Sequence, residues 1–105
     1  MPRIKHVVLM KIRADATQDQ IDDLFDGLRG LYEKLPGVLD FSGGPNNSAE
    51  GFTRGFTHGF VMTFADAAAR EVYLPDPDHE VVKAKAVGLL DGGLDGVMVL
   101  DWEEA

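Results

Sequence analysis

A single amphipathic stretch between Thr17 and Leu35 constrains this chain more than any other feature of its sequence. Its apolar residues recur at intervals of three and four, which is the repeat of one helix face. They are Ile21, Leu24, Phe25, Leu28, Leu31, Tyr32 and Leu35. Thr17 and Gln20 match a capping box at the start, and Pro36-Gly37 ends the helix. A helix with so wide an apolar face must pack on a second layer, which the rest of the chain has to supply.

Strand-like segments predict that second layer. Residues 4–13 and 55–64 are rich in β-branched, aromatic and apolar side chains, and the two-residue period of a strand sorts them into two faces. The inward face of the first carries Ile4, His6, Val8, Met10 and Ile12. The inward face of the second carries Phe56, His58, Phe60, Met62 and Phe64. Shorter segments at 38–42 and 96–102 complete a sheet of four strands.

A second helical region lies between the last two strands. Residues 65–74 predict a short helix that ends before Pro75, and Asp76 caps a following helix with Pro77 at its first position. The order β-α-β-β-α-β is the split βαβ arrangement of the ferredoxin-like fold. The sequence therefore predicts a single α+β domain over residues 1–105, with a four-stranded antiparallel sheet covered by helices on one face.

The other face of that sheet is expected to be too apolar for a stable monomer. It would carry Val7, Leu9 and Val61, together with Val97 and Val99 or their neighbours. Contiguous apolar patches of this kind on small domains mark interaction surfaces. We therefore expect a homodimer joined through the open sheet face, in which two sheets form a dimeric α/β barrel.

Charge and cysteine content exclude several classes of function. The formal net charge is −8 at pH 7, so the protein repels nucleic-acid phosphates and anionic lipid surfaces. The chain has no cysteine, which excludes disulfides and thiolate chemistry and fits a reducing compartment. Its N-terminal residues resemble neither a signal peptide nor a membrane span. We expect a cytoplasmic protein that binds neither nucleic acid nor membrane.

All three histidines fall on inward faces, and this coincidence is the most informative feature for function. His6 and His58 lie on predicted strands, His79 lies in the first turn of a helix, and Tyr73 precedes it across the proline break. A single inward histidine is usually a hydrogen-bonded core residue. Three of them beside a tyrosine indicate a polar cavity between sheet and helices. A neutral imidazole and a phenol can accept and donate protons there, as proton abstraction beside a carbonyl requires.

A three-histidine metal site is the competing interpretation, because neutral imidazole is a common metal ligand. No pair of histidines has the spacing that presents two ligands from one helix or strand. Asp76, Asp78 and Glu80 lie near His79, but acidic residues in the first turn of a helix also complement the helix dipole. We therefore expect neither a bound metal nor another cofactor.

Several short motifs occur together, in order, along nearly the whole chain. They are Lys5-His6-Val7-Val8-Leu9 with Lys11, Gly44-Pro45-Asn46 with Ser48 and Glu50, Thr57-His58-Gly59-Phe60 with Thr63-Phe64, and Tyr73 followed by Pro77 and His79. In this combination the chain resembles the stress-responsive A/B barrel domain family, called Dabb. The resemblance implies a ferredoxin-like fold and a dimer whose two sheets form a barrel.

The resemblance also implies a candidate chemistry. The family includes a plant polyketide cyclase that closes a linear polyketide by intramolecular aldol condensation without a cofactor. The base proposed for that enzyme matches His79, its orienting tyrosine matches Tyr73, and its two pocket histidines match His6 and His58. Its pocket lining matches Phe25, Leu28 and Phe60.

Two departures from that enzyme affect substrate rather than fold. Leu28 stands where the cyclase has an aromatic residue, and Asp76 replaces a histidine common before the proline. The resemblance thus implies a cofactor-independent acid-base enzyme for a small carbonyl-bearing, apolar or aromatic metabolite, with no substrate assigned. A non-catalytic dimer that is associated with stress or binds a ligand is the alternative. A cofactor-free monooxygenase is a weaker one, because only the fold suggests it.

Overall fold

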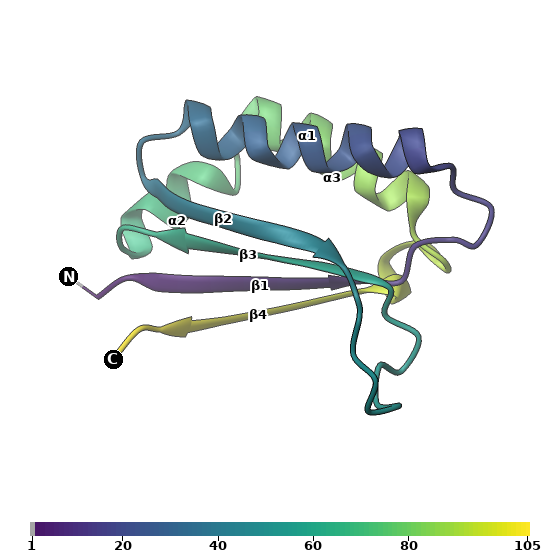
Figure 1. Ribbon diagram of the computed structural model, residues 1–105. Helices are drawn as coiled ribbons and strands as arrows, with labels where there is room; N and C mark the ends of the chain where they lie inside the picture. Colours follow the sequence, from purple (N-terminus) through teal and green to yellow (C-terminus); the bar gives the residue numbers. More distant parts are fainter. Residues whose placement is uncertain (1) are drawn as a thin grey trace.

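The computed structural model describes residues 2–105, and its elements follow the predicted order. They are β1 (Ile4–Met10), α1 (Gln18–Lys34), β2 (Val38–Pro45), β3 (His58–Phe64), α2 (Ala67–Tyr73), α3 (Pro77–Leu89), the 3-10 turn η1 (Gly93–Gly96) and β4 (Val97–Glu103). The strands form one antiparallel sheet in the order β2-β3-β1-β4. The helices lie on one face of this sheet (Figure 1). The predicted ferredoxin-like fold is therefore confirmed.

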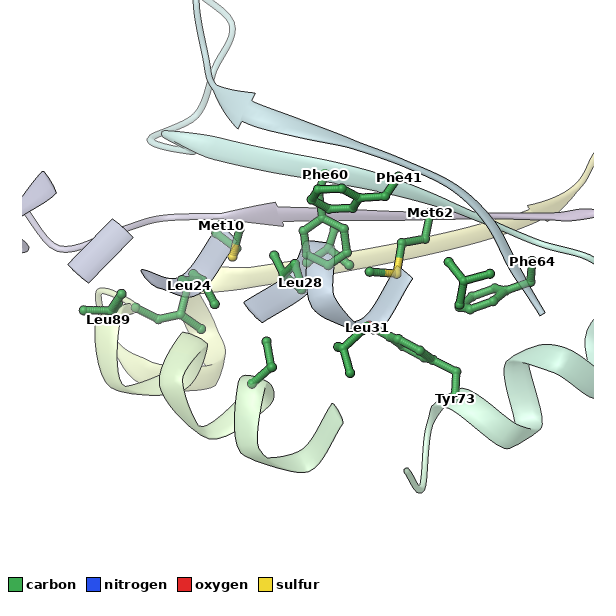
Figure 2. Packing of buried hydrophobic residues seen from close by; sticks show 14 of the residues in the cluster. Met10, Leu24, Leu28, Leu31, Phe41, Phe60, Met62, Phe64, Tyr73 and Leu89 are labelled. Carbon is green, nitrogen blue, oxygen red and sulfur yellow. The ribbon is translucent and has the colours of Figure 1, made fainter. Parts of the chain in front are cut away.

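The amphipathic helix forms where the sequence places it. The Thr17 hydroxyl accepts a hydrogen bond from the Gln20 amide at 3.1 Å, and the Gln20 side chain accepts one from the Thr17 amide at 2.9 Å. The face that α1 turns inward buries Leu24, Leu28 and Leu31. These leucines meet the aromatic and methionine side chains of the sheet (Figure 2). The core thus lies between the helices and the sheet, where burial of apolar surface stabilises the fold.

The boundaries differ from the predicted ones at the loop end of the long strands. β1 ends at Met10 rather than residue 13, although Ile12 still forms an isolated bridge with Leu90. β3 begins at His58 rather than residue 55, because Arg54 and Gly55 adopt left-handed backbone angles that a strand does not allow. β2 runs to Pro45 rather than residue 42. The loop between β2 and β3 therefore covers residues 46–57, and it both begins and ends later in the sequence than predicted.

The open face of the sheet is defined by register. Leu9, Val7 and Lys5 pair with Met98, Leu100 and Trp102 across β1 and β4, and directly paired residues share a face. The three β4 side chains are about half exposed. Val97 and Val99 point to the helix side of the sheet. Their neighbours Met98 and Leu100 are therefore the residues that join Val7 and Leu9 on the open face. Within residues 2–105, no helix is long and apolar enough to span a membrane.

Candidate active site

A cavity of about 310 Å³ lies between the helices and the β1–β4 half of the sheet. Buried side chains of β1, β3 and α1 form its inner walls, and α3 lines it from residue 79 to residue 87. The exposed side chains of Lys83, Leu94 and Val99 lie at its mouth. Apolar residues make up most of the wall. The polar exceptions are His6, Tyr73, His79 and Lys83.

His79 is held in one orientation by the start of α3. The Asp76 carboxylate accepts hydrogen bonds from the amides of Asp78 and His79, at 2.8 and 3.2 Å, and so caps the helix. Nδ1 of the His79 ring lies 2.9 Å from the Leu74 carbonyl oxygen. A carbonyl can only accept, so Nδ1 carries the hydrogen and donates it. In the neutral ring, Nε2 is consequently the nitrogen with a free lone pair, as a general base requires.

Tyr73 lies directly against His79, with ring centroids 4.2 Å apart. Only 1% of Tyr73 is exposed, and this burial raises the pKa of its hydroxyl, which therefore stays protonated. Tyr73 lines the cavity, so its phenol is a neutral hydrogen-bond donor on the cavity wall.

His6 enters the same cavity from β1 and belongs to a chain of charged groups. Its Nδ1 lies 2.7 Å from a carboxylate oxygen of Asp101, and the other carboxylate oxygen lies 3.1 Å from the Arg70 guanidinium. In the neutral ring, Nδ1 donates to Asp101 and Nε2 keeps its lone pair. The His6 and Tyr73 ring centroids are 5.9 Å apart. The rings of His6 and His79 therefore both lie next to Tyr73.

The sequence motifs include neither Asp101 nor Arg70. Asp101 pairs directly with His6 across β1 and β4, so the two side chains share the helix-facing side. An acidic residue within the apolar run of residues 97–102 is the signal that identifies Asp101. Arg70 carries no comparable signal, because it lies on α2, thirty-one positions away in sequence. Its place next to Asp101 depends on how α2 packs over the sheet.

His58 and Phe25 lie apart from this cavity, and here the predicted single site is wrong. His58 pairs with Met10, whereas His6 pairs with Met62, so the two imidazoles lie toward opposite ends of their strands. The His58 ring packs on Phe25 at 6.0 Å and contacts the Thr57 hydroxyl at 2.8 Å. Both residues line a separate surface depression beside α1. Partial burial lowers the pKa of His58.

The remaining predicted residues are placed as follows. Leu28 and Phe60 line the cavity with His6, Tyr73 and His79.

Within the described part of the chain, no three histidine or acidic side chains come together as metal ligands. The three-histidine interpretation does not hold, because His58 lies outside the cavity that His6 and His79 share.

The cavity combines the groups that proton transfer needs. It contains two imidazoles with defined neutral tautomers and one phenol that stays protonated, all surrounded by apolar side chains. Such walls exclude water and strengthen each hydrogen bond to a bound molecule. The arrangement can take a proton from one atom of a ligand and stabilise negative charge on another.

Comparisons with known proteins agree with this fold. Residues 4–104 match the family model described as Stress responsive A/B Barrel Domain, Dabb. A dimeric ferredoxin-like protein of unknown function from Jannaschia sp. is 31% identical, covering 97% of this chain and 99% of that one, with a TM-score of 0.90. An Arabidopsis thaliana protein is 27% identical, covering 97% and 95%, with a TM-score of 0.86.

A hydroxynitrile lyase from Passiflora edulis is 19% identical, covering 99% of this chain and 94% of that one, with a TM-score of 0.88. At this identity the likeness shows a shared fold alone. No curated protein matches the sequence. The family match over residues 4–104 and the Jannaschia structure at 31% identity lead to one conclusion: this chain belongs to the stress-responsive A/B barrel domain (Dabb) family.

Proposed function

We propose that this protein is a cofactor-independent acid-base enzyme that acts on a small carbonyl-bearing, apolar or aromatic metabolite. The reaction would be of the lyase or aldol type, like that of a polyketide cyclase. The observation that carries the proposal is the contact between Tyr73 and His79 inside an apolar cavity. The bond from Nδ1 of His79 to the Leu74 carbonyl supports it, because this bond leaves Nε2 as the base.

The proposed reaction begins with a proton transfer from carbon. Nε2 of His79 takes a proton from the carbon next to a carbonyl, and the electron pair of the C–H bond moves toward the carbonyl oxygen. The Tyr73 hydroxyl donates a hydrogen bond to that oxygen as negative charge develops. The enolate carbon then attacks a second carbonyl carbon of the same molecule. The proton on His79 passes to the new alkoxide, so no external reagent is consumed.

His6 has a positioning role in this proposal. Its ring is fixed by Asp101, and its Nε2 can hold the substrate or a water molecule beside Tyr73. Leu28 and Phe60 give the ligand apolar walls. His58 and Phe25 receive no role in this cavity, since both lie outside it.

Ligand binding without turnover is the second candidate function. The predominantly apolar wall favours it, because such a wall can hold an aromatic molecule without any chemical step. The Passiflora edulis lyase supports catalysis only by showing that this fold carries a lyase. An assay of proton abstraction separates the two functions without knowledge of the natural substrate.

Hydrogen–deuterium exchange at the methyl group of acetophenone in D₂O provides that assay, followed by proton NMR. We expect the wild-type protein to accelerate exchange, and His79→Gln to lower the rate by about a hundredfold. The matched control is His58→Gln, which removes an imidazole from the same face of the sheet outside the cavity. We expect this control to stay within about twofold of wild type.

Equal exchange rates for wild type and His79→Gln would contradict the proposal. If acetophenone binds and shifts the NMR signals of the cavity residues while exchange stays at the protein-free rate, the second candidate is supported instead. Circular dichroism of both variants verifies that each one is folded.

We also propose that two copies of this chain associate through the open sheet face. Val61, Met98, Leu100 and Trp102 expose apolar surface there, and the similar Jannaschia structure is dimeric. Within residues 2–105, the helices lie on the opposite face of the sheet (Figure 1). Sedimentation equilibrium at micromolar concentration tests the assembly. A dimer that dissociates in Leu100→Glu supports this interface, and a wild-type monomer excludes it.

A further inference from the structure

The polar part of the cavity wall is unusual for so acidic a protein. The chain has 18 aspartate and glutamate residues against 10 lysine and arginine residues. Nevertheless, no acidic side chain of residues 2–105 lines the cavity. Its polar residues are two imidazoles, a phenol and Lys83. The phenol and the Lys83 ammonium group can donate hydrogen bonds to a ligand, and the ammonium group carries a positive charge. The wall therefore suits a ligand whose negative charge lies near Lys83.

Lys83 lies on the cavity side of α3, one turn beyond His79. Side chains four positions apart lie above one another on a helix, and each leans toward the helix N-terminus. Lys83 and His79 therefore share one face of α3, and both line the cavity. Lys83 is exposed at the mouth, where its methylene stem can cover apolar wall while its ammonium group stays in contact with water.

Within residues 2–105, Lys83 differs from the other lysines in having no partner. Lys5 contacts Thr63 and Glu104, and Lys11 lies over the Phe56 ring. Lys34 pairs with Asp76 and Asp78, and Lys85 pairs with Asp23. Within the described residues, Lys83 has no ion pair, hydrogen bond or ring contact. Its charge is left available to a molecule that enters the cavity.

We propose that Lys83 binds an anionic group of the ligand at the cavity mouth and thereby selects carbonyl compounds that carry a carboxylate or phosphate. This inference rests on the proposed function for the identity of the reacting carbonyl. The apolar inner wall holds the body of the ligand, Tyr73 and His79 meet its carbonyl, and Lys83 meets its charged end.

Three probes of similar shape test this selection. They are 4-acetylbenzoate, its uncharged methyl ester, and 4-acetylphenyl phosphate. Affinities are measured by isothermal titration calorimetry, and binding in the cavity is verified by chemical-shift changes at the His79 ring. We expect the wild-type protein to bind one or both anions roughly tenfold more tightly than the ester. The anion with the higher affinity identifies the carboxylate or the phosphate as the group recognised.

Substitutions at two lysines of α3 locate the effect. Lys83→Gln is expected to remove the preference for the anions, and Lys83→Glu to reverse it. Lys85→Gln is the matched control, because Lys85 pairs with Asp23 of α1 and does not line the cavity. An unchanged preference in Lys83→Gln would overturn the inference. So would equal wild-type affinity for all three probes, or binding of none of them at millimolar concentration.

The same samples separate this inference from the proposed function. Exchange of the acetyl protons of 4-acetylbenzoate in D₂O reports catalysis, whereas the affinity ratio reports Lys83. An anion preference without accelerated exchange supports the role of Lys83 and contradicts the enzymatic proposal. Accelerated exchange without an anion preference supports the enzymatic proposal and contradicts the role of Lys83.

Discussion

His6 and His58 show how two residues of the same type, on the same face of one sheet, come to have different surroundings. His6 is buried, bonded to Asp101 and in line with Tyr73 and His79. His58 is partly exposed, bonded to Thr57 and packed on Phe25. The two histidines lie toward opposite ends of the sheet, and different helices cover those ends. Knowing which face of a strand a residue occupies is therefore not enough to predict which site it joins.

The largest effect on the exchange rate is expected when the Tyr73 hydroxyl is removed, at the end of the sheet where His6 is buried. In Tyr73→Phe we expect acetophenone exchange to fall by a hundredfold or more, because the donor to the developing oxyanion is lost. Stability should change little, because the ring and its packing against Phe64 and His79 are kept. Tyr32→Phe on α1 is the control, because Tyr32 does not line the cavity. Equal rates in the two variants would remove Tyr73 from the mechanism.

Substitution of the residue that bonds each histidine compares the two ends further, and its expected effect on the exchange rate is intermediate. Asp101→Asn keeps the shape of the side chain but weakens its hold on Nδ1 of His6. We expect exchange to fall about tenfold to a hundredfold, which is the range found for groups that orient metal-bound histidines. The ¹⁵N shifts of His6 should report a changed tautomer. Thr57→Val, beside His58, should leave the rate unchanged. A normal rate in Asp101→Asn with altered His6 shifts would show that this orientation is dispensable.

The pH dependence of stability tests the exposed end, where the expected effect is smallest. Burial lowers the pKa of His58 in the folded protein below its unfolded value of about 6.5. As the pH falls through that unfolded value, the unfolded chain binds the proton first, so stability decreases. His58→Gln should reduce this acid sensitivity, as measured by urea unfolding at pH 7.5 and pH 5. A pH dependence identical to that of wild type would show that His58 does not contribute to it.

Local patterns carry most of the fold. The three- and four-residue repeat identifies α1, Thr17 caps it, and the two-residue alternation of β1 and β3 assigns their inward faces. The sequence does not assign the faces of β4, because residues 97–100 form a continuous apolar run with no alternation. Only pairing with β1 assigns Asp101 to the cavity side and Leu100 to the open face.

The candidate site depends more on tertiary structure. The contact of Tyr73 with His79 follows from the proline break that brings the two residues together, so the sequence could identify it. The position of Arg70 and the separation of His58 from His6 depend on how α2 and α1 pack over the two ends of the sheet. Sequence periodicity does not describe that packing.

One glycine lies where α1 and α3 pack closely above the sheet. A methyl group at Gly27 would lie 3.1 Å from a methyl carbon of Val82, so α1 and α3 approach as closely as they do because position 27 has no side chain. Val82 also lines the cavity. Enlarging residue 27 would press Val82 inward or part the two helices. The size of molecule admitted can thus evolve from the outer layer of the protein while the reacting groups stay unchanged.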